Sequence, residues 1–157
     1  MSFVRRFHGK FRWEKVTLQD YKSHGSHFRN VTRQVLFDQP HGLSSELRYF
    51  EVAPAGYTSL EQHRHPHAVM VLRGRGMALV GEEISQITPF DLIIVPPLTW
   101  HQFRALDDSP LGFLCLVDAS RDRPIRPSDR ELAVLRNHPG IGPFIRPQTE
   151  DSREVTK

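Results

Sequence analysis

The chain of 157 residues is long enough for one domain with a complete hydrophobic core, whereas two separate domains would each be only marginally stable. Apolar residues account for 38% of the sequence and charged residues for 25%, as in ordinary globular proteins. The longest apolar run, around LIIVPPL, is too short and too interrupted by proline to cross a bilayer, which excludes a transmembrane helix.

The formal net charge of +3 hides a basic N-terminal arm, which we assign to residues 1–30. Residues 1–33 contain eight lysines or arginines against Glu14 and Asp20. These basic residues are scattered among apolar ones and form no recognisable nucleic-acid module, so we expect no nucleic-acid partner. A solvated basic edge that faces an anionic substrate or a partner subunit is the better explanation.

The chain contains a single cysteine, Cys115, which cannot form an internal disulfide. No apolar segment of a secretion signal follows the basic residues of MSFVRRFHGKFRW. Both features agree with a reducing compartment, and we expect a cytoplasmic protein.

Short runs of strand-forming residues recur between residues 31 and 118, each bounded by Gly, Pro, Asp or Asn. This spacing predicts an antiparallel sandwich or small barrel, with turns at QPHG, PAG, GEE and PP. The RGRG segment with Gly74 and Gly76 indicates a turn or bulge, since no helix follows it as a phosphate-binding loop requires. In chain order, the predicted strands are TRQVLF, SELRYFEV, YTSLEQH, HAVMVL, MALV, ISQI, DLIIV, WHQFRA and GFLCLV.

One helix is predicted in the C-terminal part, residues 119–157, and the rest of that part is a polar, proline-rich tail. Ser128 and Glu131 form a capping-box pattern, and the segment HPG ends the helix. Leu132, Val134 and Leu135 are expected to cover one end of the sheet core.

The segment EQHRHPH, residues 61–67, places three histidines and a glutamate within seven residues. Such a segment is either a solvated polar turn or part of a metal site, because imidazole is a common surface group as well as the commonest transition-metal ligand. His101, on the predicted strand that follows the Pro-Pro turn, favours the metal site by offering a further ligand from another part of a barrel.

These residues resemble the cupins, a superfamily of small double-stranded β-helix barrels that generally hold a metal in the barrel mouth. Their first motif is a glycine, four or five residues, His-x-His, three or four residues, a Glu or His, six residues and a glycine. Gly56, Glu61, His63, His67 and Gly74 match this spacing with Glu61 at the first histidine position. A rival register that pairs His63 with His65 leaves too few residues for a hairpin.

The second cupin motif is matched less completely. Pro96 and His101 occupy its proline and histidine positions, whereas Phe90, Leu98 and Ala105 replace its two glycines and its asparagine. The resemblance covers about residues 45–117. It implies an all-β double-stranded β-helix followed by a short C-terminal helix, and it implies a homodimer, because cupins commonly pair through their barrels.

Strand alternation supports the same ligand set, Glu61, His63, His67 and His101. Glu61 and His63 face one way, and a hairpin through residues 64–66 would return His67 to that face. One carboxylate with three imidazoles leaves open coordination positions on a divalent cation. Mn(II) is the expected metal, with Fe(II), Ni(II), Co(II) and Zn(II) as alternatives.

Cys115, in PLGFLCLVD, is either a buried packing residue or a thiol that faces the metal. The cysteine and both motifs together resemble a cupin branch, the methylthiotransferases or methylsulfurylases of a methionine-salvage route. Those enzymes use manganese to remove the methylthio group of S-methyl-1-thioxylulose 5-phosphate, pass it to a cysteine and then to glutathione, and leave 1-deoxyxylulose 5-phosphate. The resemblance therefore implies a catalytic Cys115 and glutathione or another thiol as a co-substrate.

The phosphate of such a substrate needs cationic partners, for which Arg48 and Arg104 are candidates, while Tyr57 and His65 are candidate pocket residues or proton donors. Exposed strand arginines and core tyrosines are the alternative explanations.

Two other functions remain open at this point. One is an Fe(II)-dependent cupin dioxygenase that needs no cysteine, and the other is a non-catalytic cupin that binds a metal or a small ligand.

Overall fold

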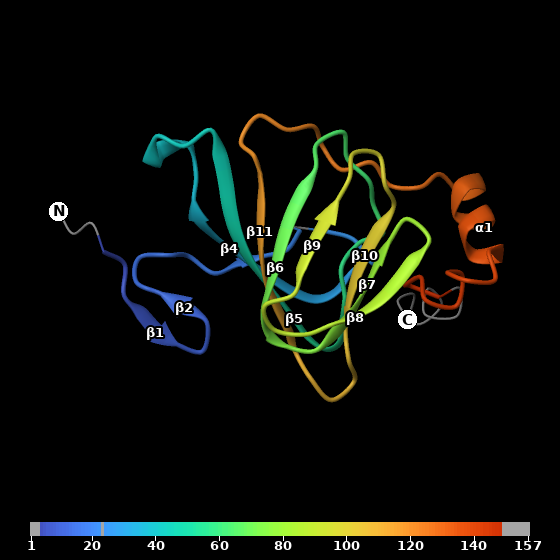
Figure 1. Cartoon of the computed structure of the whole chain (residues 1–157), viewed down its shortest axis with the longest axis horizontal. Helices are drawn as coiled ribbons and strands as arrows, with labels where there is room; N and C mark the ends of the chain where they lie inside the picture. The colour runs from blue at the N-terminus through green and yellow to red at the C-terminus, as the bar shows by residue number, and fades with distance from the viewer. Residues whose placement is uncertain (1–3, 23, 149–157) are drawn as a thin grey trace.

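The computed structural model describes residues 4–22 and 24–148, and its main body is a curled antiparallel sheet (Figure 1). A 3₁₀ turn, η1 (Gln39–His41), joins two of the long strands, and the helix α1 (Asp129–Asn137) follows the sheet. The strands are β1 (Phe7–Gly9), β2 (Arg12–Trp13), β3 (Gln19–Asp20), β4 (Arg29–Phe37), β5 (Ser45–Tyr57), β6 (His67–Gly74), β7 (Gly76–Val80), β8 (Glu83–Ile87), β9 (Leu92–Val95), β10 (His101–Ala105) and β11 (Leu111–Asp118).

The main sheet runs in the order β8-β7-β10-β5-β11-β6-β9, and β4 pairs with β5. The long strand β5 holds the barrel together because its first part pairs with β4 and β11, while its last residue, Tyr57, pairs with β10. This architecture confirms the predicted all-β barrel with a short C-terminal helix. Within the described residues, no helix is long and apolar enough to cross a bilayer.

The barrel interior contains a hydrophobic cluster to which every strand from β4 to β11 contributes. It includes Val52, Val71 and Leu111, each completely buried, and also Phe113 and Cys115. Because side chains alternate across a strand, the residues of each strand that face the barrel interior include both these apolar side chains and polar ones further along the same strand.

A second, smaller core lies under the C-terminal part of the chain. Leu60, Leu79, Ile141, Phe144 and Ile145 are buried together, and Leu132 and Leu135 of α1 pack against them. The Ser128 hydroxyl accepts a hydrogen bond from the Glu131 backbone, which confirms the predicted capping box. Val134, predicted to cover the core, is instead 66% exposed. The segment after the helix is likewise more than a polar tail, since its apolar residues Ile141, Phe144 and Ile145 are buried.

The first part of the N-terminal arm, the β1–β2 hairpin, packs on the outer face of the sheet. The β1–β2 hairpin places Phe11 against Tyr49, with ring centroids 5.3 Å apart, and Trp13 against the same ring at 5.4 Å. The side-chain amide of Gln34 donates to the Phe11 carbonyl at 2.9 Å. The packing of Phe11 and Trp13 against Tyr49 explains why apolar residues are interspersed with the basic ones in the arm.

The predicted hairpin through residues 64–66 is wrong. Glu61 forms an isolated bridge with His101, and Gln62 forms one with Ile125, while β6 begins only at His67 and pairs with β9 and β11. The run YTSLEQH is therefore the end of β5 followed by an irregular connection. The side chains of this connection reach the barrel interior through pairing with distant residues and not through a local turn.

The RGRG segment is a sharp change of direction between β6 and β7, as predicted. Gly74 has a φ of +71°, and a Cβ at this residue would lie 1.7 Å from the Pro110 carbonyl oxygen. Gly81 has a similar φ of +65°, but its Cβ would meet the nearest atom, in Thr99, at an ordinary 3.7 Å.

We therefore expect Gly74→Ala to lower the free energy of unfolding by about 3 kcal/mol or more, because it adds a backbone clash to a strained dihedral angle. Gly81→Ala, which has only the dihedral cost, should lose about 1 kcal/mol. Chemical denaturation of both variants measures the difference. Equal losses at the two glycines would contradict the close approach at Pro110.

Candidate metal centre and thiol

A cavity of about 270 Å³ lies inside the barrel and receives side chains from most of its strands. Its apolar wall consists of Phe50, Phe103 and Phe113, and its polar wall contains the four predicted metal ligands and Cys115. The structure thus brings all five of the central predicted residues to one chamber. Among the described residues, the cavity is lined by Tyr21, Lys22, Arg33, Arg48, Phe50, Thr58, Ser59, Glu61, His63, His65, His67, His101, Phe103, Phe113, Cys115, Arg121, Asp122 and Pro124.

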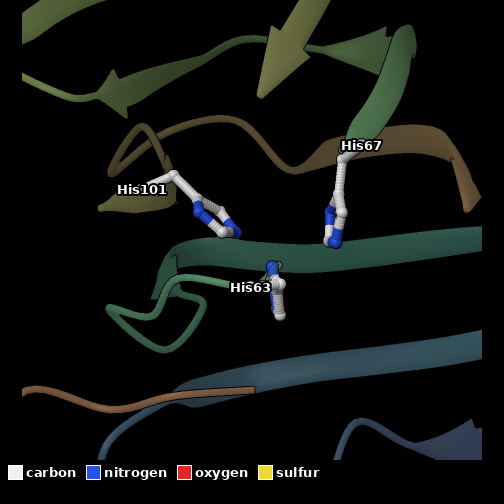
Figure 2. Close-up of side chains that lie close together, drawn as sticks. All are labelled: His63, His67 and His101. Atoms are coloured by element: carbon white, nitrogen blue, oxygen red, sulfur yellow. The ribbon is translucent and has the colours of Figure 1, made fainter. Parts of the chain in front are cut away.

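Three buried imidazoles converge in this cavity (Figure 2). His63, His67 and His101 each offer a nitrogen, and these three nitrogens lie within 4.8 Å of one another. His67 opens β6 and His101 opens β10, so two of the ligands are placed by the first residue of a strand. His63 comes from the irregular connection, which its neighbour Glu61 ties to His101 through the isolated bridge.

Two of the three imidazoles, those of His67 and His101, are electrically neutral at neutral pH. Burial lowers the pKa of His67 to about 2, helped by the adjacent His101 and His63, and burial lowers the pKa of His101 to about 4. The His101 Nδ1 lies 2.9 Å from the Thr99 carbonyl oxygen and donates to it, which leaves Nε2 as a lone-pair donor. Nδ1 of His63 is buried without a hydrogen-bond partner among the described residues. Neutral, oriented nitrogens of this kind fit a borderline divalent cation.

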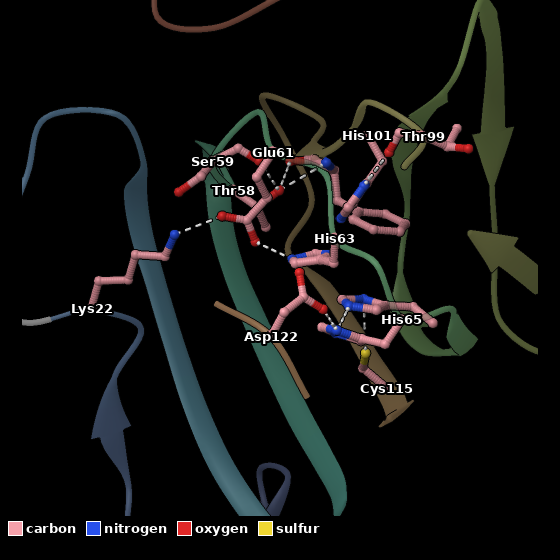
Figure 3. A network of polar contacts seen from close by, with 12 residues as sticks. Lys22, Thr58, Ser59, Glu61, His63, His65, Thr99, His101, Cys115 and Asp122 are labelled. Atoms are coloured by element: carbon pink, nitrogen blue, oxygen red, sulfur yellow. Dashed lines mark hydrogen bonds and ion pairs between the residues drawn. The ribbon is translucent and has the colours of Figure 1, made fainter. Parts of the chain in front are cut away.

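Glu61 lies next to the three imidazoles but outside their 4.8 Å group. Its Oε1 is 3.2 Å from His63 Nε2, and its Oε2 accepts a 2.7 Å hydrogen bond from the Lys22 ammonium group (Figure 3). Burial alone would raise the pKa of Glu61, but the hydrogen bond with His63 and the Lys22 charge outweigh it and lower the pKa to about 2. The group is therefore a carboxylate across the neutral pH range. Sequence reasoning did not anticipate Lys22, which the N-terminal arm brings to the cavity.

His65 is also buried, although it lies in the bend between the two flanking histidines. Its Nδ1 is 2.7 Å from the Asp122 carboxylate, which also accepts from the Arg64 backbone amide, and its Nε2 is 3.1 Å from His67 Nε2. Burial lowers the pKa of His65, whereas Asp122 opposes that effect. His65 thus lies between a carboxylate and a candidate metal ligand, inside the cavity.

Cys115 faces the barrel lumen, which strand alternation alone could not decide. Its Sγ is 3.3 Å from Arg48 Nη2 and 3.5 Å from His67 Nδ1. Burial raises the pKa of the Cys115 thiol, and the Arg48 guanidinium opposes this rise. The sulfur therefore lies beside a candidate metal ligand and beside a cation that stabilises its negative form.

Of the four predicted substrate-binding residues, Arg48 and His65 line the cavity, whereas Arg104 and Tyr57 do not. Arg104 donates to the Phe144 carbonyl at 2.8 Å and stacks over the Phe144 ring, on the side of β10 opposite Phe103. Tyr57 is buried beneath the Arg29 guanidinium. The positions of Arg104 and Tyr57 do not support contact with a ligand in this cavity. Two other cavity arginines, Arg33 and Arg121, were missed.

Comparison with known proteins decides the family. The cupin domain family matches residues 48–117, and a curated protein of Rhodospirillum rubrum is 51% identical over 142 residues, which are 90% of each chain. The chain belongs to the cupin family. That relative is named 1-methylthio-D-xylulose 5-phosphate methylsulfurylase.

Solved structures agree with this assignment. A cupin 2 conserved barrel domain protein from Rhodopseudomonas palustris is 48% identical, with a TM-score of 0.86 over 92% of this cupin and 99% of that chain. A cupin-2 domain protein from Rhodospirillum rubrum is 50% identical, with a TM-score of 0.81 over 90% of this cupin and 95% of that chain. The three-histidine group of this cupin can hold a divalent metal.

Proposed function

We propose that this cupin is a metal-dependent methylthiotransferase that removes the methylthio group of 1-methylthio-D-xylulose 5-phosphate through Cys115. The observation that carries the proposal is the position of a buried thiol 3.5 Å from a histidine of the three-imidazole group. The name of the R. rubrum relative, which is 51% identical over 90% of the chain, supplies the substrate class.

The metal would be held by His63, His67 and His101, with Glu61 as a fourth ligand. Ligand bonds of about 2.1 Å place adjacent ligand atoms of one cation about 3 Å apart, and Glu61 Oε1 lies 3.2 Å from His63 Nε2. When bound, a divalent cation of this kind supplies Lewis-acid polarisation of a carbonyl oxygen. We propose Mn(II), because three nitrogens and a hard carboxylate form a mixed ligand set with open positions.

The chain's own residues provide the transfer step. The Cys115 thiolate attacks the sulfur of the methylthio group, a sulfur–sulfur bond forms, and the bond from that sulfur to C1 of the sugar breaks. The electron pair of the broken bond moves to C1 and delocalises onto the neighbouring carbonyl oxygen as an enolate. Arg48, at 3.3 Å, stabilises the thiolate before the attack.

Protonation of C1 completes the sugar product, 1-deoxyxylulose 5-phosphate. The Lys22 ammonium lines the cavity and is available as the proton donor, with Glu61 holding it in place at 2.7 Å. The enzyme is left with a methyl disulfide on Cys115. A glutathione thiolate resolves it by thiol–disulfide exchange, which releases glutathione methyl disulfide and regenerates the thiolate. The substrate carbon C1 is reduced, and the methylthio sulfur and the glutathione sulfur are oxidised to the disulfide. Dependence on a reduced thiol pool is consistent with a cytoplasmic location.

The test is an anaerobic incubation of the manganese-loaded protein with 1-methylthio-D-xylulose 5-phosphate and glutathione. We expect 1-deoxyxylulose 5-phosphate and glutathione methyl disulfide in equal amounts, measured by NMR and mass spectrometry. Oxygen consumption by iron-loaded protein without the deoxy sugar would instead indicate a dioxygenase. Ligand binding without any product would indicate a binding protein.

We also propose that the protein is a homodimer, joined through the outer face of β6, β9 and β11. The strand pairing places Leu116 beside Ala68 and Ala68 beside Ile94. Two residues further along on the same outer face, Met70 lies beside Leu92. Ile94 is 63% exposed and Leu92 is 71% exposed. An apolar sheet face of this kind is typical of a protein contact surface.

Analytical ultracentrifugation should give a mass of twice 18.2 kDa for the wild-type protein. Ile94→Glu should give the monomer, because it buries an unpaired carboxylate in an apolar interface. Glu83→Gln, which changes an exposed charge on β8, is the control that should remain dimeric. A wild-type protein that sediments as a monomer would contradict the proposal.

A further inference from the structure

We propose that Arg33, Arg48 and Arg121 form a binding site for a phosphate monoester dianion in the cavity wall. All three line the cavity, and they come from β4, from β5 and from the segment after β11. Only the identification of the anion as the substrate's own phosphate group rests on the proposed function. The existence of the anion site rests on the geometry and charge of these arginines.

Strand pairing places two of the arginines on the same inner face. Arg33 pairs with Phe50 across β4 and β5, and Arg48 pairs with Cys115 across β5 and β11. Paired positions share a face of a sheet, and Phe50 and Cys115 both belong to the inner core. Arg33 and Arg48 are two residues apart in the register, so their side chains are diagonal neighbours within reach of one ligand.

The local charge is unbalanced. Glu46 is the carboxylate of this cluster, and its Oε1 lies 2.9 Å from Arg121 Nη2 and 3.6 Å from Arg48 Nε. Arg33 is paired with the neutral side chain of Gln19, whose Oε1 accepts from Nη2 at 3.1 Å. With Cys115 as the neutral thiol, the described residues of this cluster carry three guanidinium groups against one carboxylate. This leaves two positive charges, which match the charge of a phosphate monoester near neutral pH.

The other carboxylates of the cavity are occupied elsewhere. Glu61 accepts from Lys22, and Asp122 accepts from the Arg64 backbone amide and lies 2.7 Å from His65. The charge excess is felt within the cluster, since burial and the neighbouring Arg48 both lower the pKa of Arg33. An anion bound here would relieve this repulsion.

Arg48 also has an unused donor. Its side chain is buried, and its Nη2 donates to the Cys115 sulfur at 3.3 Å. Its Nε lies 3.6 Å from Glu46 Oε1, too far for a hydrogen bond, and makes no hydrogen bond to the described residues. A buried guanidinium N–H without an acceptor is costly. Phosphate oxygens accept from arginine N–H groups in the planar geometry that guanidinium offers, and such charge-assisted bonds are strong.

The test is calorimetric titration of the metal-loaded wild-type protein with 1-deoxyxylulose 5-phosphate and, separately, with 1-deoxyxylulose. We expect the phosphorylated sugar to bind at least about tenfold more tightly, because a charge-assisted hydrogen bond contributes about 1.5–3 kcal/mol. Arg33→Gln and Arg121→Gln should each reduce this preference about tenfold. Arg75→Gln removes the same charge from an exposed pair with Asp108 outside the cavity, and it should leave the preference unchanged.

Equal affinity for the two sugars, or a preference that survives in both cavity variants, would overturn the anion site. Thermal unfolding and metal content show whether each variant is folded. If neither is, inorganic phosphate provides a second reading on the wild-type protein. It should compete with the phosphorylated sugar, and the site is overturned if it does not. If methylthio transfer is observed and the variants keep the same preference for the phosphorylated sugar, the anion site is contradicted and the proposed function is not. If phosphate binds without methylthio transfer, the proposed function is contradicted and the anion site is not.

Discussion

Cys115→Ser should reduce formation of 1-deoxyxylulose 5-phosphate by at least about a thousandfold, because removal of a covalent nucleophile typically costs several orders of magnitude in turnover. The hydroxyl fits the space of the thiol but does not attack sulfur. The measurement is single-turnover formation of the deoxy sugar under anaerobic conditions with saturating manganese and glutathione.

Cys115→Ala is the matched variant and should be equally inactive. Both variants should bind manganese in the same amount as the wild-type protein, because the sulfur lies beside His67 and not within the three-imidazole group. Full activity in Cys115→Ser would refute the thiol-transfer mechanism and favour chemistry at the metal alone. Loss of manganese together with activity would instead assign the sulfur to the metal site.

The second large effect concerns the metal ligands. His101→Ala or His67→Ala should weaken manganese binding by at least about a hundredfold, since even partners that only orient a ligand contribute about ten- to a hundredfold. Glu61→Gln should weaken it as well. Metal content after dialysis, with competition by a chelator, measures these affinities directly.

His8→Ala is the control, because His8 lies on the exposed N-terminal hairpin. It should retain full metal content. Removal of the metal from the wild-type protein by a chelator should abolish turnover, and added manganese should restore it. A His101→Ala protein that retains its metal would contradict the proposed ligand set. Metal loss in Glu61→Gln alone, with the histidine variants still loaded, would indicate a different set of ligands.

Spacing in the sequence was sufficient to predict the convergence of His63, His67 and His101, but not the path of the chain between them. The sequence suggested a local hairpin after His63. The structure instead pairs Glu61 with His101, and such a bridge across forty residues leaves no local pattern.

Strand parity explains both a success and an error. It placed Cys115 on the same side as Phe113 and Val117, and the structure shows that this side is the lumen, because Cys115 and Phe113 line the cavity. His101 and Arg104 are three residues apart on one strand, so their side chains face opposite ways. If His101 faces the cavity, strand alternation therefore predicts that Arg104 faces away from it. The positive charge of Arg104 suggested a phosphate contact, but strand alternation excludes one in this cavity.

The residues that sequence reasoning missed depend on contacts between distant segments. Arg33 reaches the cavity through the register of β4 against β5, and Lys22 reaches it because the N-terminal arm folds back. Ile141, Phe144 and Ile145 belong to a buried core, yet they occur among glycines and prolines without a helical or strand period. No pattern within a single segment could have indicated any of these positions.

The most direct test of the proposed transfer is intact-protein and peptide mass spectrometry after incubation with 1-methylthio-D-xylulose 5-phosphate in the absence of glutathione. The proposal predicts that Cys115 gains one methylthio group in place of its hydrogen, in an amount equal to the deoxy sugar formed, and that glutathione then removes it. Repeated turnover with an unmodified Cys115 throughout would contradict it.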